Sequence, residues 1–314
     1  MTNQTTIRQG ENTVEITGVL AENRLEYYTS QDKKNYIRGQ FDIKTGENES
    51  HTVRVFSSEL KKDGKPSAGY KGFETVMNEY KSIQDVGEAE ATKIMVRSGT
   101  LEMNDYKGGD GMVRSFPQIS TFSVSRPKSE VDAQPKAELT IEGYIQSIAP
   151  ETDREGEETG RLKLKLVVGL YGGAVAPFEF IAPAGDIAEH IESNWEVGQT
   201  VTVFADIVNR VETKVIKKEV SFGKPKEKTV TNTTREYVIT GGSEPYDTDD
   251  AKVYSTEAIK AALAEREVML EALKNEKKDD KKKEAPKKAG FGKAVTKKKE
   301  ADASIDISDD DLPF

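Results

Sequence analysis

Strict alternation of apolar and polar side chains marks residues 36–43, YIRGQFDI, and residues 52–56, TVRVF. A repeat of two is the spacing of a β-strand that has one face in a core and the other in solvent. In both stretches the odd-numbered positions carry the apolar side chains or glycine. The sequence therefore predicts two strands whose odd-numbered residues face a core and whose even-numbered residues face solvent.

Further strands and one helix are expected on either side of this pair. The strands are predicted from about 14 to 28, from 92 to 103 and from 112 to 124, and the helix over 70–83, where apolar residues recur at helical spacing. A glycine-rich turn at 104–111 joins the last two strands. The resulting order, with a helix between the third and fourth of five strands, is that of the oligonucleotide/oligosaccharide-binding (OB) fold, a Greek-key barrel.

The same order of elements recurs in the second half of the chain. Strands are expected near 139–145, 161–166, 174–181, 200–210 and 213–222, with a short helix at 184–193. One more strand at 235–239 is predicted as an addition to this unit. The chain is therefore predicted to be mainly β, with two tandem five-stranded OB-fold barrels, a C-terminal helix and a disordered tail.

These elements divide the chain into consecutive segments. Ser255 is the expected N-cap of the C-terminal helix, whose apolar stripe is interrupted by Arg266. That helix could pack on the body of the protein or on a second copy in a homodimer. The predicted segments are a first OB-fold domain (1–127), a linker (128–137), a second OB-fold domain with an extra strand (138–246), the helix (254–276), a disordered Lys-rich tail (277–302) and an acidic tip (303–314).

Charge is distributed unevenly along the 314 residues. The chain has 46 Lys and Arg against 55 Asp and Glu, a formal charge of -9, which is unusual for a protein that binds a polyanion. Residues 1–136, however, hold 19 basic against 20 acidic residues, and residues 277–299 hold eleven lysines. The first domain is thus nearly neutral and can arrange a basic groove, so the overall sign does not argue against nucleic acid.

Several classes of function lack the residues they need. There is no Cys, which excludes disulfides and thiol catalysis, and two His residues are too few for a multi-His metal site. No phosphate-binding Walker A motif occurs. We therefore predict no enzyme activity, no metal and no cofactor. The polar start of the sequence and the lack of a long apolar run predict a cytoplasmic protein without a membrane segment.

The last six residues form a compact ligand: Asp309, Asp310, Asp311, Leu312, Pro313 and Phe314. The Leu and Phe side chains can fill an apolar pocket while the carboxylates meet Arg or Lys. This ending resembles the acidic tip of bacterial single-stranded-DNA-binding (SSB) proteins, in which an Ile usually stands where this chain has Leu312. The barrels show no sequence match to the bacterial SSB barrel. Two barrels per chain resemble two-barrel SSB variants and divergent SSBs encoded by bacteriophages.

The resemblance implies a function and a set of partners. An SSB binds and protects single-stranded DNA, without regard to its sequence, in replication, recombination and repair. The tip would recruit helicases, primases, nucleases and polymerase subunits. A phage-encoded form would act in the cytoplasm of the bacterial host.

OB folds bind their ligands across strands 2 and 3, between the loops that join strands 1–2 and 4–5. Aromatic side chains on that face can stack on bases, and Arg or Lys can meet phosphates. The glycine-rich hairpin is expected to act as a mobile finger that closes over the strand. The predicted contacts to single-stranded DNA are Tyr27, Tyr28, Lys33, Lys34, Tyr36, Arg38, Arg54, Phe56, Tyr106, Lys107, Arg114 and Phe116.

The second barrel has a different predicted face. Its second strand points Arg161, Lys163 and Lys165 outwards but offers no aromatic ring. These residues can contact phosphates, and we treat them as a second set of possible DNA contacts.

Two alternatives stay open at the level of sequence. The barrels could bind proteins, which would make the chain an adaptor, or the same DNA-binding face could serve a strand-annealing or recombination mediator. An outward aromatic side chain could also be covered by a loop or a subunit. The combination of aromatic and basic residues on one face favours strand binding over the adaptor.

Overall fold

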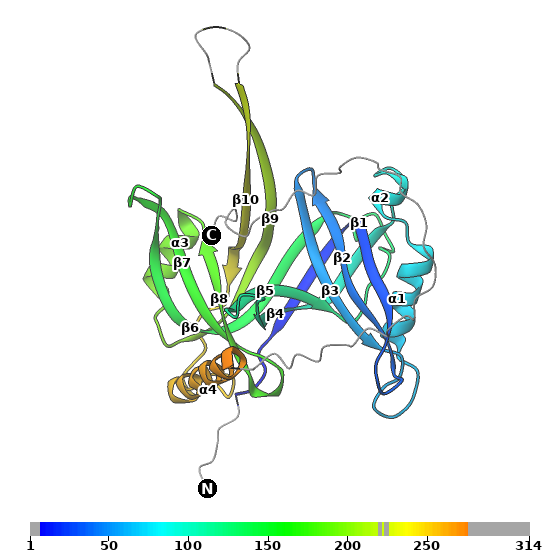
Figure 1. Ribbon diagram of the computed structural model, residues 1–314. Coiled ribbons are helices and arrows are strands. Elements are labelled where there is room, and N and C mark those ends of the chain that lie inside the picture. Colours follow the sequence, from blue (N-terminus) through cyan, green and yellow to red (C-terminus); the bar gives the residue numbers. More distant parts are fainter. Residues whose placement is uncertain (1–6, 219–221, 223–225, 276–314) are drawn as a thin grey trace, which may run out of the picture. The chain divides into compact units, whose positions relative to one another are not determined.

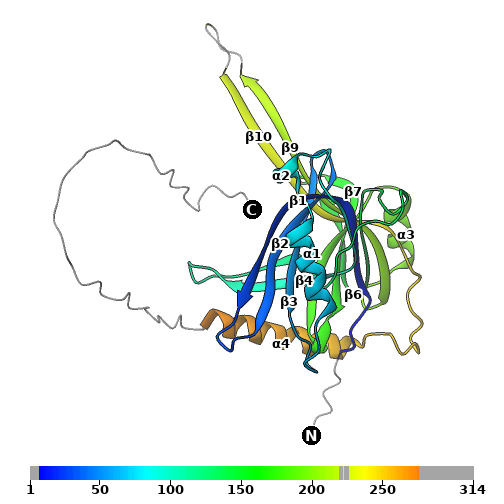
Figure 2. The same cartoon turned by 90° about the vertical axis from the view of Figure 1, so that its right-hand side faces the viewer.

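The computed structural model describes residues 7–218, 222 and 226–275 (Figures 1 and 2). The predicted disordered tail and acidic tip (277–314) lie outside the described residues. None of the helices in the described part of the chain is long and apolar enough to span a membrane.

Five strands of the first half close into a barrel. β1, β2 and β3 form an antiparallel meander, β4 pairs with β1 and with β5, and β5 returns to pair in parallel with β3. Two helices lie between β3 and β4. This is the predicted OB topology. The elements are β1 (Asn12–Thr29), β2 (Asn35–Gly46), β3 (Glu49–Ser58), α1 (Ala68–Glu79), α2 (Ile83–Val86), β4 (Lys93–Lys107) and β5 (Val113–Thr121).

The second half repeats this closure. β7 pairs with β6 and β8, β9 pairs with β6 and β10, and β10 meets β8 in parallel. The prediction of a mainly β chain with two tandem OB-fold barrels and a C-terminal helix is confirmed. The elements are β6 (Lys136–Thr152), β7 (Glu158–Gly169), the short helix η1 (Tyr171–Gly173), β8 (Val175–Ala182), α3 (Asp186–Asn194), β9 (Thr200–Lys218) and β10 (Lys226–Gly242).

Four predicted elements differ from the structure in their bounds. No strand starts at 213, because β9 runs without interruption to Lys218, and the supposed extra strand at 235–239 belongs to β10, the fifth strand of the barrel. The sequence at 211–213 has no glycine or proline to turn the chain, whereas Gly223 and Pro225 stand between the two strands. The predicted helix over 70–83 ends at Glu79, and β6 starts at Lys136, inside the predicted linker.

The alternation in β2 and β3 has the predicted orientation. Ile37, Phe41, Ile43, Val53 and Val55 are at most 1% exposed, whereas the even-numbered side chains between them remain accessible. Branched and aromatic side chains on the odd-numbered positions thus form the interior of the first barrel. The even-numbered positions are left free for a ligand.

The two barrels share hydrogen-bonded strands. Residues 12–17 of β1 pair with residues 136–141 of β6, and Glu49 of β3 is in register with Arg210 of β9. The Asn209 side chain adds a hydrogen bond of 2.6 Å to the carbonyl oxygen of Ser50. Both barrels therefore belong to one ten-stranded sheet.

The C-terminal helix α4 (Thr256–Asn275) packs on the body of the protein, one of the two arrangements left open by its sequence. The Ser255 hydroxyl accepts a hydrogen bond from the Ala258 amide, as predicted for the N-cap. Ile259 is 1% exposed and packs with Tyr144, Val167 and Val175 of the second barrel. The start of α4 is thereby anchored to the second barrel.

Candidate nucleic-acid interface

Three aromatic side chains from adjacent strands meet on the outer face of the first barrel. The ring centroids of Tyr36 and Phe56 are 5.0 Å apart with an interplanar angle of 25°, and those of Tyr28 and Tyr36 are 6.2 Å apart. Strand register explains the contacts, since Tyr28 pairs with Tyr36 and Phe56 lies diagonally across from it. Phe56 is 55% exposed. We call Tyr28, Tyr36 and Phe56 the aromatic cluster.

Three arginines lie on the same outer face, next to the aromatic cluster and further along the strands. Arg38 places its guanidinium carbon 3.9 Å from the centroid of the Tyr28 ring. The register then aligns Arg24, Gln40 and Arg54 across β1, β2 and β3. Together with Phe56, these side chains line a shallow pocket of about 560 Å³. We call Arg24, Arg38 and Arg54 the arginine row.

Each of these arginines already has a polar partner. Arg38 Nε donates to Glu26 at 2.7 Å, and Arg24 pairs with Asp42 at 2.8 Å and with Glu22. Arg54 Nη1 donates to the Gln118 side chain of β5 at 3.1 Å. Exposed pairs of this kind contribute little, about 0–1 kcal/mol, so a phosphate can replace the partner at low cost. The pairs hold the guanidinium groups in place on the face.

The β4–β5 hairpin carries a second pair of aromatic side chains. Tyr106 and Phe116 meet edge to face at 5.7 Å, and both are more than one-third exposed. Arg114 forms an ion pair of 2.7 Å with Asp110 at the turn. Lys107 Nζ donates to the carbonyl oxygen of Lys274 at the end of α4. The predicted finger therefore contacts α4 rather than projecting freely into solvent.

Other predicted contacts are placed apart from the aromatic cluster. Tyr27 points to the opposite face of β1, because successive side chains of a strand alternate. Tyr27 is 52% exposed on that opposite face. Lys33 and Lys34 are exposed at the β1–β2 turn, next to the end of the strands that carry Tyr28 and Tyr36.

The sequence prediction missed three polar residues on this face. Arg24 lies four residues before Tyr28 on the same face of β1, so counting back along the alternation would have found it. Gln40 was predicted to point outwards but was not assigned as a contact. Gln118 could not be found this way, because its contact with Arg54 depends on the pairing of β3 with β5.

The basic row of the second barrel is largely neutralised by acids. Arg161 pairs with Glu151 at 3.2 Å and with Glu236 at 2.5 Å, and Lys163 lies 3.8 Å from Glu151. Lys165 stands opposite Glu179 in the β7–β8 register. The three side chains point outwards as predicted, but acidic side chains beside them offset their positive charge.

The family model described as YorF matches residues 11–276, which include both barrels and α4. The chain belongs to the YorF family. No curated protein sequence matches this YorF-family chain.

Solved structures that match this chain include two of the SSB protein from Thermus aquaticus. The wild-type protein is 14% identical over 77% of this chain and 97% of its own, with a TM-score of 0.48. A deletion mutant is 14% identical over 78% of this chain and 98% of its own, with a TM-score of 0.44. A replication protein A heterotrimer bound to single-stranded DNA is 8% identical over 74% of this chain and 50% of its own, with a TM-score of 0.20.

Proposed function

We propose that the chain binds single-stranded DNA on the outer face of β1, β2 and β3. The observation that carries this proposal is the Tyr36–Phe56 stack beside the Arg38 guanidinium, with Phe56 left 55% exposed. Unpaired bases stack on aromatic rings with about 1–3 kcal/mol per base, and arginines neutralise the phosphates between them. A duplex hides its base faces and gains nothing from such rings.

The proposed path of the strand starts at the aromatic cluster and follows the arginine row. Gln118 holds Arg54 and lies two residues from Phe116 along β5, which points the path towards the Tyr106–Phe116 pair. Lys33 and Lys34 flank the other end. Every base has a stacking face, so this arrangement supports binding that tolerates any sequence. The second barrel, whose Arg161 and Lys163 are already paired with acids, is assigned a supporting role.

The single-strand preference can be tested by titrating the protein with labelled oligo(dT) and with a duplex of equal length, at two salt concentrations. We expect tight binding of oligo(dT) and at least about tenfold weaker binding of the duplex, because only the single strand offers base faces for stacking. The three arginines and two lysines of the path would neutralise a few phosphates, which gives a slope of about -2 to -4 in log K against log salt. Equal affinity for the duplex would contradict the proposal.

We further propose that the acidic tip recruits DNA-processing proteins such as helicases, primases, nucleases and polymerase subunits. Support comes from the sequence alone, through the resemblance of residues 309–314 to the SSB tip. With single-strand binding by the first barrel, this would place the chain in replication, recombination or repair, as a phage-encoded protein acting in the host cytoplasm.

Deleting residues 309–314 should separate the two activities. We expect loss of binding to a purified bacterial helicase that recognises acidic SSB tips, while affinity for oligo(dT) stays within about twofold or rises slightly, because acidic groups that repel DNA are removed. Phe314→Ala is the matched control for the apolar anchor and should also abolish helicase binding. Unchanged helicase binding by both variants, measured by surface plasmon resonance, would exclude recruitment through the tip.

A further inference from the structure

We propose that Arg266 of α4 is a positioning residue that braces the β4–β5 hairpin and so fixes the Tyr106–Phe116 pair in place for the strand. The DNA-binding part of this inference rests on the proposed function. The brace itself depends only on the contacts between α4 and the hairpin.

The hairpin needs support because most of it has no neighbouring strand. Within the described residues, β4 pairs with β1 only over 93–99, and β5 pairs with β3 only over 119–121. Residues 102–107 and 113–118 therefore pair only with each other in the sheet. An isolated two-stranded ribbon is at best marginally stable in water. The aromatic pair lies on this unsupported part.

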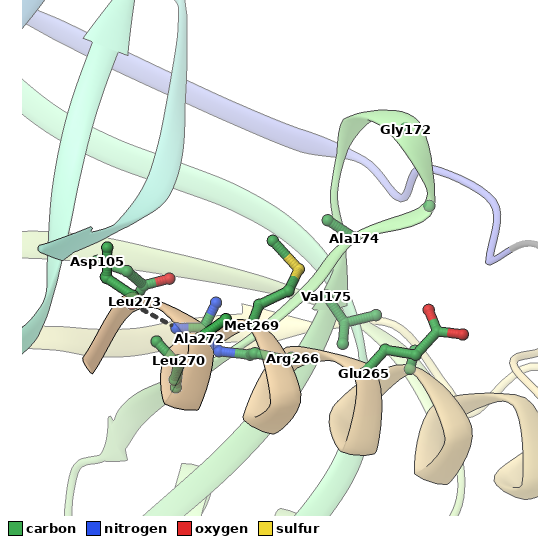
Figure 3. Close-up of a pocket in the computed structure, with 12 residues that line it drawn as sticks. Asp105, Gly172, Ala174, Val175, Glu265, Arg266, Met269, Leu270, Ala272 and Leu273 are labelled. Atoms are coloured by element: carbon green, nitrogen blue, oxygen red, sulfur yellow. Dashed lines mark hydrogen bonds and ion pairs between the residues drawn. The ribbon is translucent and has the colours of Figure 1, made fainter. Parts of the chain in front are cut away.

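Arg266 reaches the ribbon through a partly buried ion pair. Its Nη2 lies 2.7 Å from Oδ1 of Asp105, and the two side chains are only 16% and 23% exposed (Figure 3). The same Asp105 oxygen accepts a hydrogen bond of 2.5 Å from the Ser115 hydroxyl across the ribbon. One carboxylate thus ties both strands of the hairpin to the helix.

A second contact and apolar packing complete the brace. Lys107 Nζ donates to the carbonyl oxygen of Lys274 at 2.6 Å, one strand position past the Tyr106 ring. Beside these contacts a groove of about 660 Å³ is lined by Asp105, by Val175 of the second barrel and by Leu270 and Leu273 of α4 (Figure 3). The first turn of α4 is buried on the second barrel at Ile259, and Arg266 and Lys274 further along the helix contact a hairpin of the first barrel. Arg266, which interrupts the apolar stripe in the sequence, contributes the ion pair to this brace.

The brace lowers the conformational entropy that the binding site loses when a DNA strand binds. A ribbon that moves freely must lose conformational freedom when a strand binds, whereas a braced ribbon has already lost it. Holding the Tyr106–Phe116 pair in line with Gln118 and the arginine row therefore favours binding without any contact between Arg266 and DNA.

The test compares Arg266→Ala with Lys260→Ala, which removes the same charge from an exposed position on the same helix. We expect Arg266→Ala to speed amide hydrogen exchange in residues 102–107 and 113–118 of the free protein, and to weaken oligo(dT) binding about three- to tenfold, as expected for a site that loses its preorganisation. Lys260→Ala should change neither. The charge-swapped double variant, Asp105→Arg with Arg266→Asp, should recover most of the exchange protection.

Hydrogen exchange tests the brace, and oligo(dT) affinity tests the positioning role of Arg266. Unchanged exchange in Arg266→Ala would overturn the brace, whatever the protein does with DNA. Faster exchange together with unchanged or tighter oligo(dT) binding would overturn the positioning role. A wild-type protein that fails to bind oligo(dT) would refute the proposed function and with it the positioning role, and the exchange data would still decide whether Arg266 holds the hairpin.

Discussion

Replacing both Tyr36 and Phe56 by alanine is expected to weaken binding to oligo(dT) by about 30- to 1,000-fold, or roughly 2–4 kcal/mol. Each ring contributes about 1–3 kcal/mol of stacking. The two losses should not add fully, because the rings touch each other and each single substitution already disturbs the stack. The measurement is a fluorescence-anisotropy titration at fixed salt, with the fold checked by thermal unfolding.

The stability of the protein should change little in this double variant. Both side chains lie on the solvent side of the sheet, where a cross-strand aromatic pair contributes only about 0.2–1 kcal/mol. A matched control removes one tyrosine and one phenylalanine elsewhere, Tyr171→Ala with Phe204→Ala, whose side chains are 83% and 45% exposed on the second barrel. The control should bind like the wild type. Equal losses of oligo(dT) affinity in both double variants would show that the binding site lies away from the aromatic cluster.

The alternation of apolar and polar residues predicted the central part of the outer face of β2 and β3. The odd-numbered side chains of β2 and β3 are buried because a repeat of two places the apolar side chains on one face of the strand, and that face must pack against the core. The outward positions of Tyr36, Arg38, Arg54 and Phe56 followed from that choice, whereas the stacking of Tyr36 on Phe56 was not predicted, because it depends on the register of β2 and β3.

Contacts between residues far apart in the chain could not be predicted in this way. Arg161 is neutralised by Glu236, 75 residues away, and Asp105 meets Arg266 at a separation of 161 residues. The pairing of β1 with β6 likewise depends on how two closed barrels come together, which no local pattern encodes. The function of an exposed charge depends on such partners, so the basic row of the second barrel was predicted to be accessible but not to be balanced by acids.

Gly39 illustrates a residue whose role is visible only in three dimensions. It occupies an inward position of β2 and has a φ of +127°, and a Cβ atom there would lie 2.2 Å from the Arg24 carbonyl oxygen and 3.1 Å from the Leu25 Cα atom. Both neighbours are backbone atoms of the paired strand β1, which cannot move away without losing the register that aligns Arg24, Gln40 and Arg54. A glycine at such a position lets two strands approach closely where a barrel bends.

Gly39→Ala is therefore expected to reduce the free energy of unfolding by roughly 2–4 kcal/mol, from backbone strain together with the steric clash. Gly64→Ala is the matched control, since Gly64 also has a positive φ, +78°, but no atom lies within 4 Å of its would-be Cβ. That variant should lose only about 1–2 kcal/mol for the unfavourable φ of an L-residue. The difference between the two variants, measured by urea unfolding, reports the close approach of β1 and β2 together with the larger positive φ of Gly39. Equal losses would mean that the strands can separate at Gly39 without cost, and the arginine row would then not depend on this contact.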